Sequence, residues 1–328
     1  MKKCIARAQV KYLHVMFGLI TKSILPKSSL FFILFFCSSV MAQTDLDAIM
    51  MAKGEFCGGL MFKRSTWTDY WEGTFKRDNR NIGRFTSQMT GLMGNYGAGK
   101  KINLLFGVPY SSNRVSGGTL AGKQGIQDLS LFVKYMPVET PLGRGTFSLY
   151  TIGGLSFPLG NYVADFLPLS IGLRSRTATL RLMTDYQIGN WFATLSGSYV
   201  FRDNIRIDRN AYYTTEMHYT NEVFMPNVFS ANFRTGYRSG KLIAELVVDN
   251  WTTLGGFDIR KNDMPFPSNR MEMTRVGLNS KYTFSKPASL SVIAGGDYVV
   301  SGRNMGQATA FHAGVFYIVD LKPKQKKK

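Results

Sequence analysis

The sequence predicts an all-β protein, an antiparallel transmembrane β-barrel of about 12 strands with both termini periplasmic. Three observations support this fold: a secretory leader, a series of alternating strands about ten residues long, and connections that alternate between long and short. In the hairpin at 176–203, apolar residues occupy alternate positions on both sides of a Gly189-Asn190 turn. Soluble proteins have strands of about five or six residues, whereas a tilted strand of about ten crosses a bilayer.

The first 42 residues have the features of a secretory signal. Six basic residues and no acidic residue accompany the apolar run at 30–36, and Val40 and Ala42 stand at the minus-three and minus-one positions before Gln43. We therefore predict a signal peptide at 1–42, an outer-membrane β-barrel at 43–321 and a Lys-rich tail at 322–328. Translation could begin at Met1 or at Met16. The predicted location is the bacterial outer membrane, with its lipid, lipopolysaccharide and barrel-assembly machinery as partners.

The formal net charge of +19 falls to +8 when the six basic residues of the leader and the five of the tail are set aside. No basic helix or RNA-binding motif accompanies this charge, so nucleic acid is not an expected partner. Cys57 is the only cysteine after residue 42. The sequence therefore excludes an intrachain disulfide and a thiol-rich metal site in the mature chain, and we expect no cofactor.

Twelve stretches alternate apolar and polar residues and are predicted to be the strands. They lie at 54–67, 85–96, 102–111, 128–135, 147–157, 176–188, 191–202, 228–237, 242–249, 276–284, 290–298 and 311–319. Their connections alternate between short and long with one late exception, as periplasmic turns and external loops do. An even number of strands leaves both termini in the periplasm. Aromatic residues near strand ends are expected to form interfacial girdles: Tyr110, Tyr135, Phe157, Trp191, Tyr237, Tyr282, Phe284 and Tyr317.

The strand positions between the apolar residues face the other side of the sheet, and charged residues at these positions are expected to line the lumen. The candidates are Asp128, Lys134, Arg181, Asp185, Arg202, Arg234, Glu245, Asp249, Arg275, Lys281, Asp297 and His312. One interpretation is structural, in which pairs such as Arg181 with Asp185 fill a narrow lumen. The other is a selectivity ladder that conducts a polar solute. The sequence leaves both interpretations open.

Two connections are candidates for ligand binding. The segment 157–172 is too apolar for a solvated loop, so Phe157, Phe166, Leu167 and Leu169 are candidates for a constriction or a ligand loop. Alternatively, this segment only prolongs two strands. The loop at 203–222 carries Tyr212, Tyr213 and Tyr219, which could stack on aromatic or sugar rings.

A barrel enzyme is the least favoured class. Some barrels of this size are phospholipases, which need a serine beside a histidine. His218 lies in a tyrosine-rich loop and His312 lies within a strand, and neither belongs to a His-x-Ser-Asn-Gly type of signature. A protease at the rim would need paired acids such as Asp203, Asp208 and Glu216, but loops are ordinarily rich in such residues. We therefore expect no catalytic residues.

Three segments resemble successive motifs of one family. They are GVPYSSN from Gly107, GIQDLSLFVKY from Gly125 and GGLSFPLGNY from Gly153. They are similar to the GLPY, GLGDLSLGLKY and FPTG segments of the outer-membrane barrel family named for the MetA pathway of phenol degradation. The similarity is best over 102–203, and Gln127 and Leu159 replace the usual Gly and Thr. The resemblance implies movement of hydrophobic or aromatic compounds across the outer membrane.

Together these observations predict an outer-membrane channel or transporter for small solutes, including hydrophobic or aromatic ones. The alternative is a structural or surface-interaction barrel with a blocked lumen, whose function lies in its external loops. A barrel-embedded hydrolase comes third.

Overall fold

The structure is a computed structural model that describes residues 44–261 and 263–321. These residues belong to the compact unit Cys37–Lys328. The predicted signal peptide and the Lys-rich tail lie outside the described residues.

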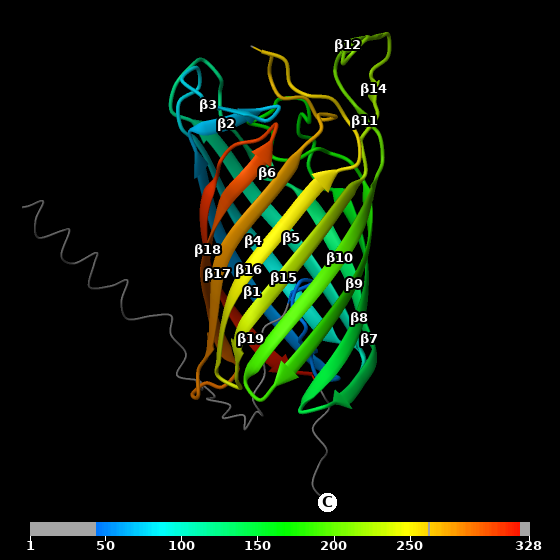
Figure 1. The fold of residues 1–328 in the computed structure, drawn as a ribbon, viewed down its shortest axis with the longest axis vertical. Coiled ribbons are helices and arrows are strands. Elements are labelled where there is room, and N and C mark those ends of the chain that lie inside the picture. The colour runs from blue at the N-terminus through cyan, green and yellow to red at the C-terminus, as the bar shows by residue number, and fades with distance from the viewer. Residues whose placement is uncertain (1–43, 262, 322–328) are drawn as a thin grey trace, which may run out of the picture. The chain divides into compact units, whose positions relative to one another are not determined.

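Twelve antiparallel strands form a closed barrel (Figure 1). In order around the wall they are β4 (Phe85–Gly97), β1 (Glu55–Trp67), β19 (Thr309–Asp320), β18 (Leu290–Arg303), β17 (Glu272–Thr283), β16 (Leu242–Thr253), β15 (Val228–Arg238), β10 (Trp191–Arg202), β9 (Thr177–Ile188), β8 (Gly145–Pro158), β7 (Asp128–Leu142) and β5 (Ile102–Val115). Pairing of β4 with β5 closes the ring, so every strand has two neighbours. The predicted fold class and the number of strands are confirmed.

The remaining strands are short. β6 (Lys123–Ile126) pairs with the outer part of β5. The others form three small hairpins or ribbons in the loops: β2 (Asp69–Glu72) with β3 (Phe75–Asp78), β11 (Ile205–Arg206) with β14 (Glu222–Val223), and β12 (Tyr212–Tyr213) with β13 (Met217–His218).

Both ends of the barrel chain lie at the same rim. Glu55 at the start of β1 is paired with Asp320 at the end of β19, and this rim, at the bottom of Figure 1, also carries the short turns. The long connections and the small hairpins lie at the opposite rim (Figure 1). This arrangement agrees with the predicted periplasmic position of both ends of the barrel.

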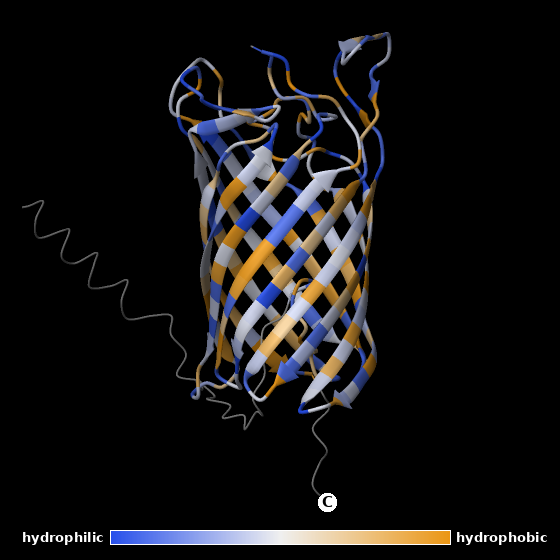
Figure 2. Cartoon of the chain, viewed as in Figure 1, coloured by the Kyte–Doolittle hydropathy of each residue, from blue (hydrophilic) through white to orange (hydrophobic). Residues whose placement is uncertain are grey.

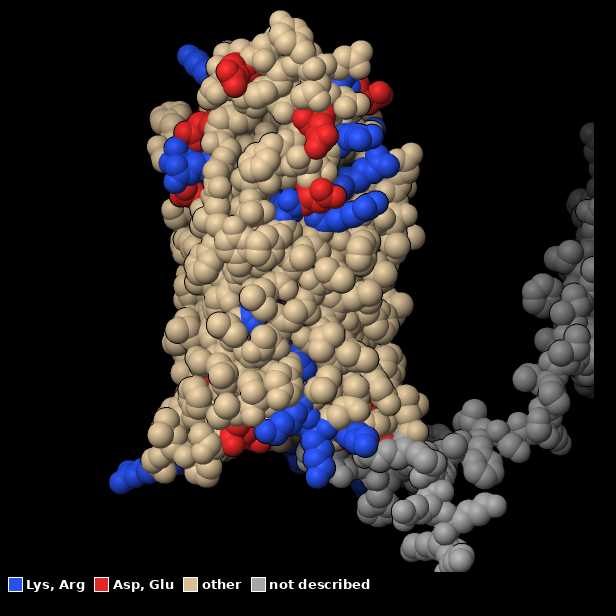
Figure 3. Space-filling view, turned by 90° about the vertical axis from the view of Figure 1, so that its right-hand side faces the viewer, with Lys and Arg blue, Asp and Glu red and all other residues tan. Residues whose placement is uncertain are grey.

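Apolar side chains cover the outside of the barrel. Leu60, Leu182, Leu195 and Leu278 each expose more than half of their surface. Hydropathy alternates along the strands (Figure 2), and on the side shown in Figure 3 the charged side chains gather at the two ends. A soluble monomer does not expose so large an apolar surface, whereas a membrane barrel needs such a band. The structure contains, within its described residues, no helix long and apolar enough to span a membrane.

The aromatic residues predicted near strand ends lie on this outer surface. At the short-turn rim, the rings of Trp191 and Tyr237 meet edge to face at 6.1 Å, and Tyr282 and Phe284 do so at 5.2 Å. Amphipathic rings at this level suit the boundary between hydrocarbon and headgroups.

One predicted turn is shorter in the structure. The segment 137–145 was expected to be a connection, but β7 continues to Leu142 and the reversal occurs at Gly143, whose φ is +59°. A register shift between Tyr135 and Val138 surrounds Pro137. Proline has no N–H for the ladder, so the strand accommodates it with an irregularity rather than ending there.

Rings lie directly over glycines in the inner wall. The Phe316 ring covers Gly59 of the neighbouring strand, so that a side-chain carbon at residue 59 would overlap both the ring and the carbonyl oxygen of Val315. By contrast, a carbon added at Gly91 would meet no atom within 4 Å.

We expect Gly59→Ala to lower the free energy of unfolding by about 1–3 kcal/mol, the usual cost of overpacking a closely packed site. The urea midpoint for unfolding in detergent micelles measures this change. Gly91→Ala serves as the matched control and should shift the midpoint by much less. Equal shifts in the two variants would contradict the packing explanation.

Candidate functional site

One side of the lumen carries a network of ion pairs. Arg234 on β15 binds Glu245 on β16 at 2.9 Å, and Arg275 on β17 binds Asp249 at 2.9 Å. Arg275 also lies 3.8 Å from Asp297 on β18. Because the partners lie on adjacent strands, the network joins neighbouring strands and makes this side of the lumen polar.

A second cluster lies nearer the short-turn rim. Arg238 binds Asp185 at 2.9 Å, and its guanidinium lies 3.8 Å from the centre of the Phe192 ring. The hydroxyl of Thr194 also donates to Asp185. The expected pair of Arg181 with Asp185 is therefore wrong, since Asp185 is held by the Arg238 side chain two strands away.

Residues 44–53 fold into the lumen at the short-turn end, and we call this segment the plug. It was expected to be part of the barrel but does not contribute to the wall. Met51 of the plug is buried against Cys57, and the hydroxyl of Tyr150 donates to the carbonyl of Ala48 at 2.9 Å. Figure 1 shows the start of the described chain within the lower part of the barrel.

Two cations of the wall hold the plug. Lys134 has 0% of its surface exposed, and its ammonium donates to the carbonyls of Thr44 and Asp47 at 2.5 and 2.8 Å. It also lies 3.2 Å from the Asp47 carboxylate. Arg181 donates to the carbonyl and the carboxylate of Asp45 at 3.0 and 2.7 Å. Since a buried cation needs such partners, the wall and the plug stabilise each other here.

Two of the cavities beside the plug are lined by both Thr44 and Asp45. One, of about 300 Å³, is lined by the charged side of the lumen, including Lys63, Arg234, Glu245 and Lys281. The other, of about 290 Å³, is mainly apolar. Its side chains from β1, β4, β5, β7 and β19 include Met61, Met89, Met93, Leu105, Phe132 and Phe316. The lumen is therefore two-sided, and methionines allow its apolar side to adapt to different shapes.

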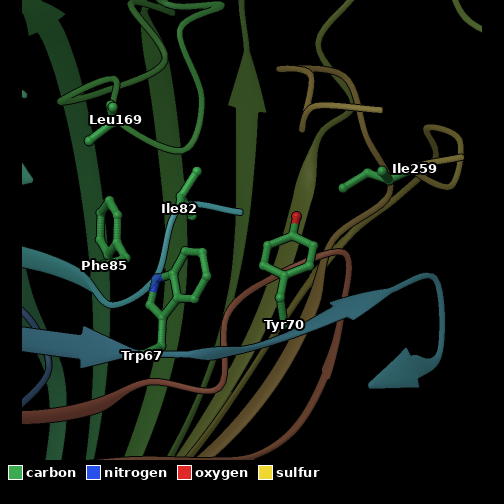
Figure 4. Packing of buried hydrophobic residues seen from close by; sticks show 6 residues of the cluster. All are labelled: Trp67, Tyr70, Ile82, Phe85, Leu169 and Ile259. Carbon is green, nitrogen blue, oxygen red and sulfur yellow. The ribbon is translucent and has the colours of Figure 1, made fainter. Parts of the chain in front are cut away.

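At the other end of the barrel, loops and strand ends meet in an apolar cluster (Figure 4). The cluster consists of Trp67, Tyr70, Ile82, Phe85, Leu169 and Ile259. We call the loops that meet here the lid. Its members come from the end of β1, from β2, from the start of β4 and from three loops, so burial of the cluster ties these segments together.

The segment 157–172 contributes to the lid, and its role as a ligand loop stays a prediction. Leu169 is completely buried in the cluster, and Phe166 packs against it. Leu167 lines a cavity among the outer loops. Phe157 is different, because it lies on the outward side of β8 with 39% of its surface exposed. The prediction that Phe157 belongs to a constriction therefore does not hold.

Asn304 joins three segments of the lid. Its side-chain oxygen accepts from the N–H groups of Gly73 at 2.7 Å and Ile259 at 3.1 Å. Its amide nitrogen donates to Asp258 at 2.7 Å and to the carbonyl of Arg270 at 2.6 Å. Asn304 is almost fully buried and has a φ of +53°, a conformation that asparagine tolerates better than most residues.

The twelve charged or polar candidates lie at positions of inward parity. Besides those described above, Asp128 accepts from the Tyr162 hydroxyl at 2.5 Å and Arg202 lies 5.4 Å from the Trp251 ring. Lys281 and His312 line the charged cavity. The parity of each strand was therefore sufficient to find these wall residues.

Sequence reasoning missed Lys63, Arg238 and the plug residues Asp45 and Asp47. Lys63 binds Asp297 at 3.3 Å, and its inward parity on the first strand was a usable signal. The end of the strand at 228–237 was placed one residue before Arg238. For Asp45 and Asp47 there was no signal, because a polar segment ahead of a strand can equally lie outside the barrel.

The two histidines within the described residues have partners in neighbouring strands or loops. His218 stacks on Tyr212 at 4.8 Å, and its Nε2 lies 2.8 Å from the hydroxyl of Thr214 in the same hairpin. His312 on β19 is paired with Gly295 on β18. In the ranges 44–261 and 263–321, His, Cys, Asp and Glu side chains form no group of three that could hold a metal.

No protein-family model matches the chain, and no curated protein matches it in sequence. Among solved structures it is similar to the COG4313 outer membrane channel from Pseudomonas putida F1, with a TM-score of 0.64 and 17% identity over 85% of this chain and 100% of that chain. The chain has an outer-membrane β-barrel fold. The translocator domain of the autotransporter NalP from Neisseria meningitidis matches less well, with a TM-score of 0.44 and 12% identity over 82% and 90% of the two chains. The resemblance to the phenol-degradation family stays a prediction.

We expect Asn304→Gly to loosen the lid. Glycine keeps the left-handed backbone but removes four hydrogen bonds worth about 1 kcal/mol each, so the lid should lose about 4 kcal/mol of stabilisation. The rate at which trypsin cuts the loop at 254–271 in detergent measures the change and should rise at least tenfold. Asn81→Gly, in an exposed loop, is the control. An unchanged cleavage rate in the Asn304 variant would contradict this role.

The lid should also loosen in acid. Two hydrogen bonds from Arg303, at 2.6 and 2.8 Å, hold the pKa of the Asp258 carboxyl below its usual value of about 4. At pH values above that usual pKa, the ionised Asp258 carboxylate stabilises the closed lid. This contribution is lost as the pH falls through the lowered pKa of the folded state.

Hydrogen-exchange protection of the loop at 254–271 should therefore fall between pH 6 and pH 3. The expected change is at most about fivefold, because an exposed ion pair contributes up to about 1 kcal/mol. Asp258→Asn should give lower protection that no longer changes over this range. Equal protection of the wild-type loop at the two pH values would rule out this dependence.

Proposed function

We propose that this protein is a channel or transporter of the outer membrane that moves small hydrophobic or aromatic solutes. The observation that carries the proposal is the lumen itself, which combines a charged side with an apolar side and retains two cavities of about 300 and 290 Å³. Cavities of about this size accommodate small organic molecules. Insertion by the barrel-assembly machinery and contact with lipopolysaccharide are part of the same proposal.

We infer that different segments close the two ends of the lumen, which supports a regulated path rather than a permanent pore. At one end the plug is held by polar contacts to Lys134 and Arg181. At the other end the lid is held by an apolar cluster and by Asn304. The plug lies outside the strand ladder, and most of the lid belongs to loops, so we infer that each can move without breaking the barrel.

Single-channel conductance in a planar bilayer tests this function. The double variant Lys134→Met with Asn304→Gly weakens both closures and should increase the fraction of time spent open at least tenfold relative to the wild type. Phenol should block the open channel at lower concentrations than glycerol does. Heat-modifiable migration on a gel would verify that each variant is folded.

A folded double variant without conductance would contradict the channel function. That outcome would favour the second candidate, a structural or surface-interaction barrel. The observation in favour of this candidate is the extent to which the plug, the ion pairs and the lid fill the lumen.

A further inference from the structure

The cations that hold the plug differ from the other cations of the lumen in their partners. Most wall carboxylates are paired with wall cations: Glu245 with Arg234, Asp185 with Arg238, Asp249 with Arg275, and Asp297 with Lys63. The acidic partners of Lys134 and Arg181 instead come from the plug, as Asp47 and Asp45. Asp47 and Lys281 both line the charged cavity.

Lys134 and Arg181 stand in one row of the sheet. Lys134 on β7 is paired with Ile152 on β8, which is paired in turn with Arg181 on β9. Two strand spacings separate the two cations, about 10 Å between backbones. Displacement of the plug would therefore leave a pair of inward-facing cations on a fixed wall, without the carboxylates that now neutralise them.

An apolar surface lies directly beside these cations. Phe132 precedes Lys134 by two residues on the same inward side of β7, and it is paired with Leu105 on β5. Phe132 and Leu105 line the apolar cavity, as do Thr44 and Asp45 of the plug. Thr44 and Asp45 also line the charged cavity, so this part of the plug lies between the two sides of the lumen.

We propose that the open channel selects amphipathic organic anions, in which a carboxylate is attached to an apolar body about as large as one aromatic ring. The carboxylate binds Lys134 and Arg181, and the apolar body lies against Phe132, Leu105 and the methionines of the apolar cavity. In the closed state, Asp45 and Asp47 occupy the carboxylate positions, so the solute and the plug compete for the same cations. This inference rests on the proposed channel function and names its class of solute.

Ion selectivity of a variant with a weakened plug is the first test. Asp45→Asn with Asp47→Asn removes the competing carboxylates and retains their size. Recorded in a potassium chloride gradient, this variant should open more often than the wild type and should prefer chloride over potassium at least threefold. Asp78→Asn, which removes an exposed carboxylate outside the lumen, is the matched control and should behave like the wild type.

Adding Lys134→Gln and Arg181→Gln to the weakened variant should bring the chloride preference back toward unity. Since the loss of two wall cations could prevent folding, a second measurement uses only the wild type and the Asp45/Asp47 variant. Benzoate, benzyl alcohol and benzylammonium have similar ring-sized bodies but carry different charges. Benzoate should raise the frequency of wild-type openings and should block the variant at a concentration at least tenfold lower than the other two probes.

The possible outcomes separate this inference from the channel function. If the Asp45/Asp47 variant conducts but benzoate and benzyl alcohol act at equal concentrations, the selection of anions is overturned and the channel function stands. A conducting variant that prefers potassium would also overturn it. If the folded variant is silent under every condition, the channel function fails and the inference fails with it.

Discussion

Pairing of backbone hydrogen bonds around a closed ring is the constraint on which the rest of this structure depends. Lipid offers no partner to an N–H or C=O group, so the sheet can have no open edge. Pairing of β4 with β5 and of β1 with β19 satisfies this requirement. Closure then divides every strand into a lipid side and a lumen side, and each side chain is assigned to one of them by its parity alone.

This division explains why so much of the fold could be predicted from the sequence. Arg181, Asp185, Arg234 and Asp249 were placed correctly because a strand that crosses a membrane must alternate over its whole length. The segment 137–145 was misjudged for a local reason. Pro137 suggested a turn, but the ladder tolerates a proline at an irregularity when the strand continues on both sides of it.

The contacts between elements could not be predicted in the same way. Parity shows that Asp185 faces inward, but it does not show that Arg238 rather than Arg181 binds it, since long side chains reach across two strands. The plug and the lid depend on contacts between segments distant in the chain, such as Lys134 with Asp47 or Leu169 with Trp67. Periodicity carries no information about such pairs, because neither the plug nor most of the lid has a repeating pattern.

The plug covers the thiol of Cys57, so the accessibility of this thiol depends on the position of the plug. The thiol belongs to the first strand, packs against Met51 of the plug and lines the apolar cavity, while the other two cysteines of the sequence lie within the predicted leader. The mature chain would thus carry a single native thiol, which is shielded from thiol-reactive reagents while the plug stays in place. Its rate of labelling would therefore report how often the plug leaves, without introducing a foreign cysteine.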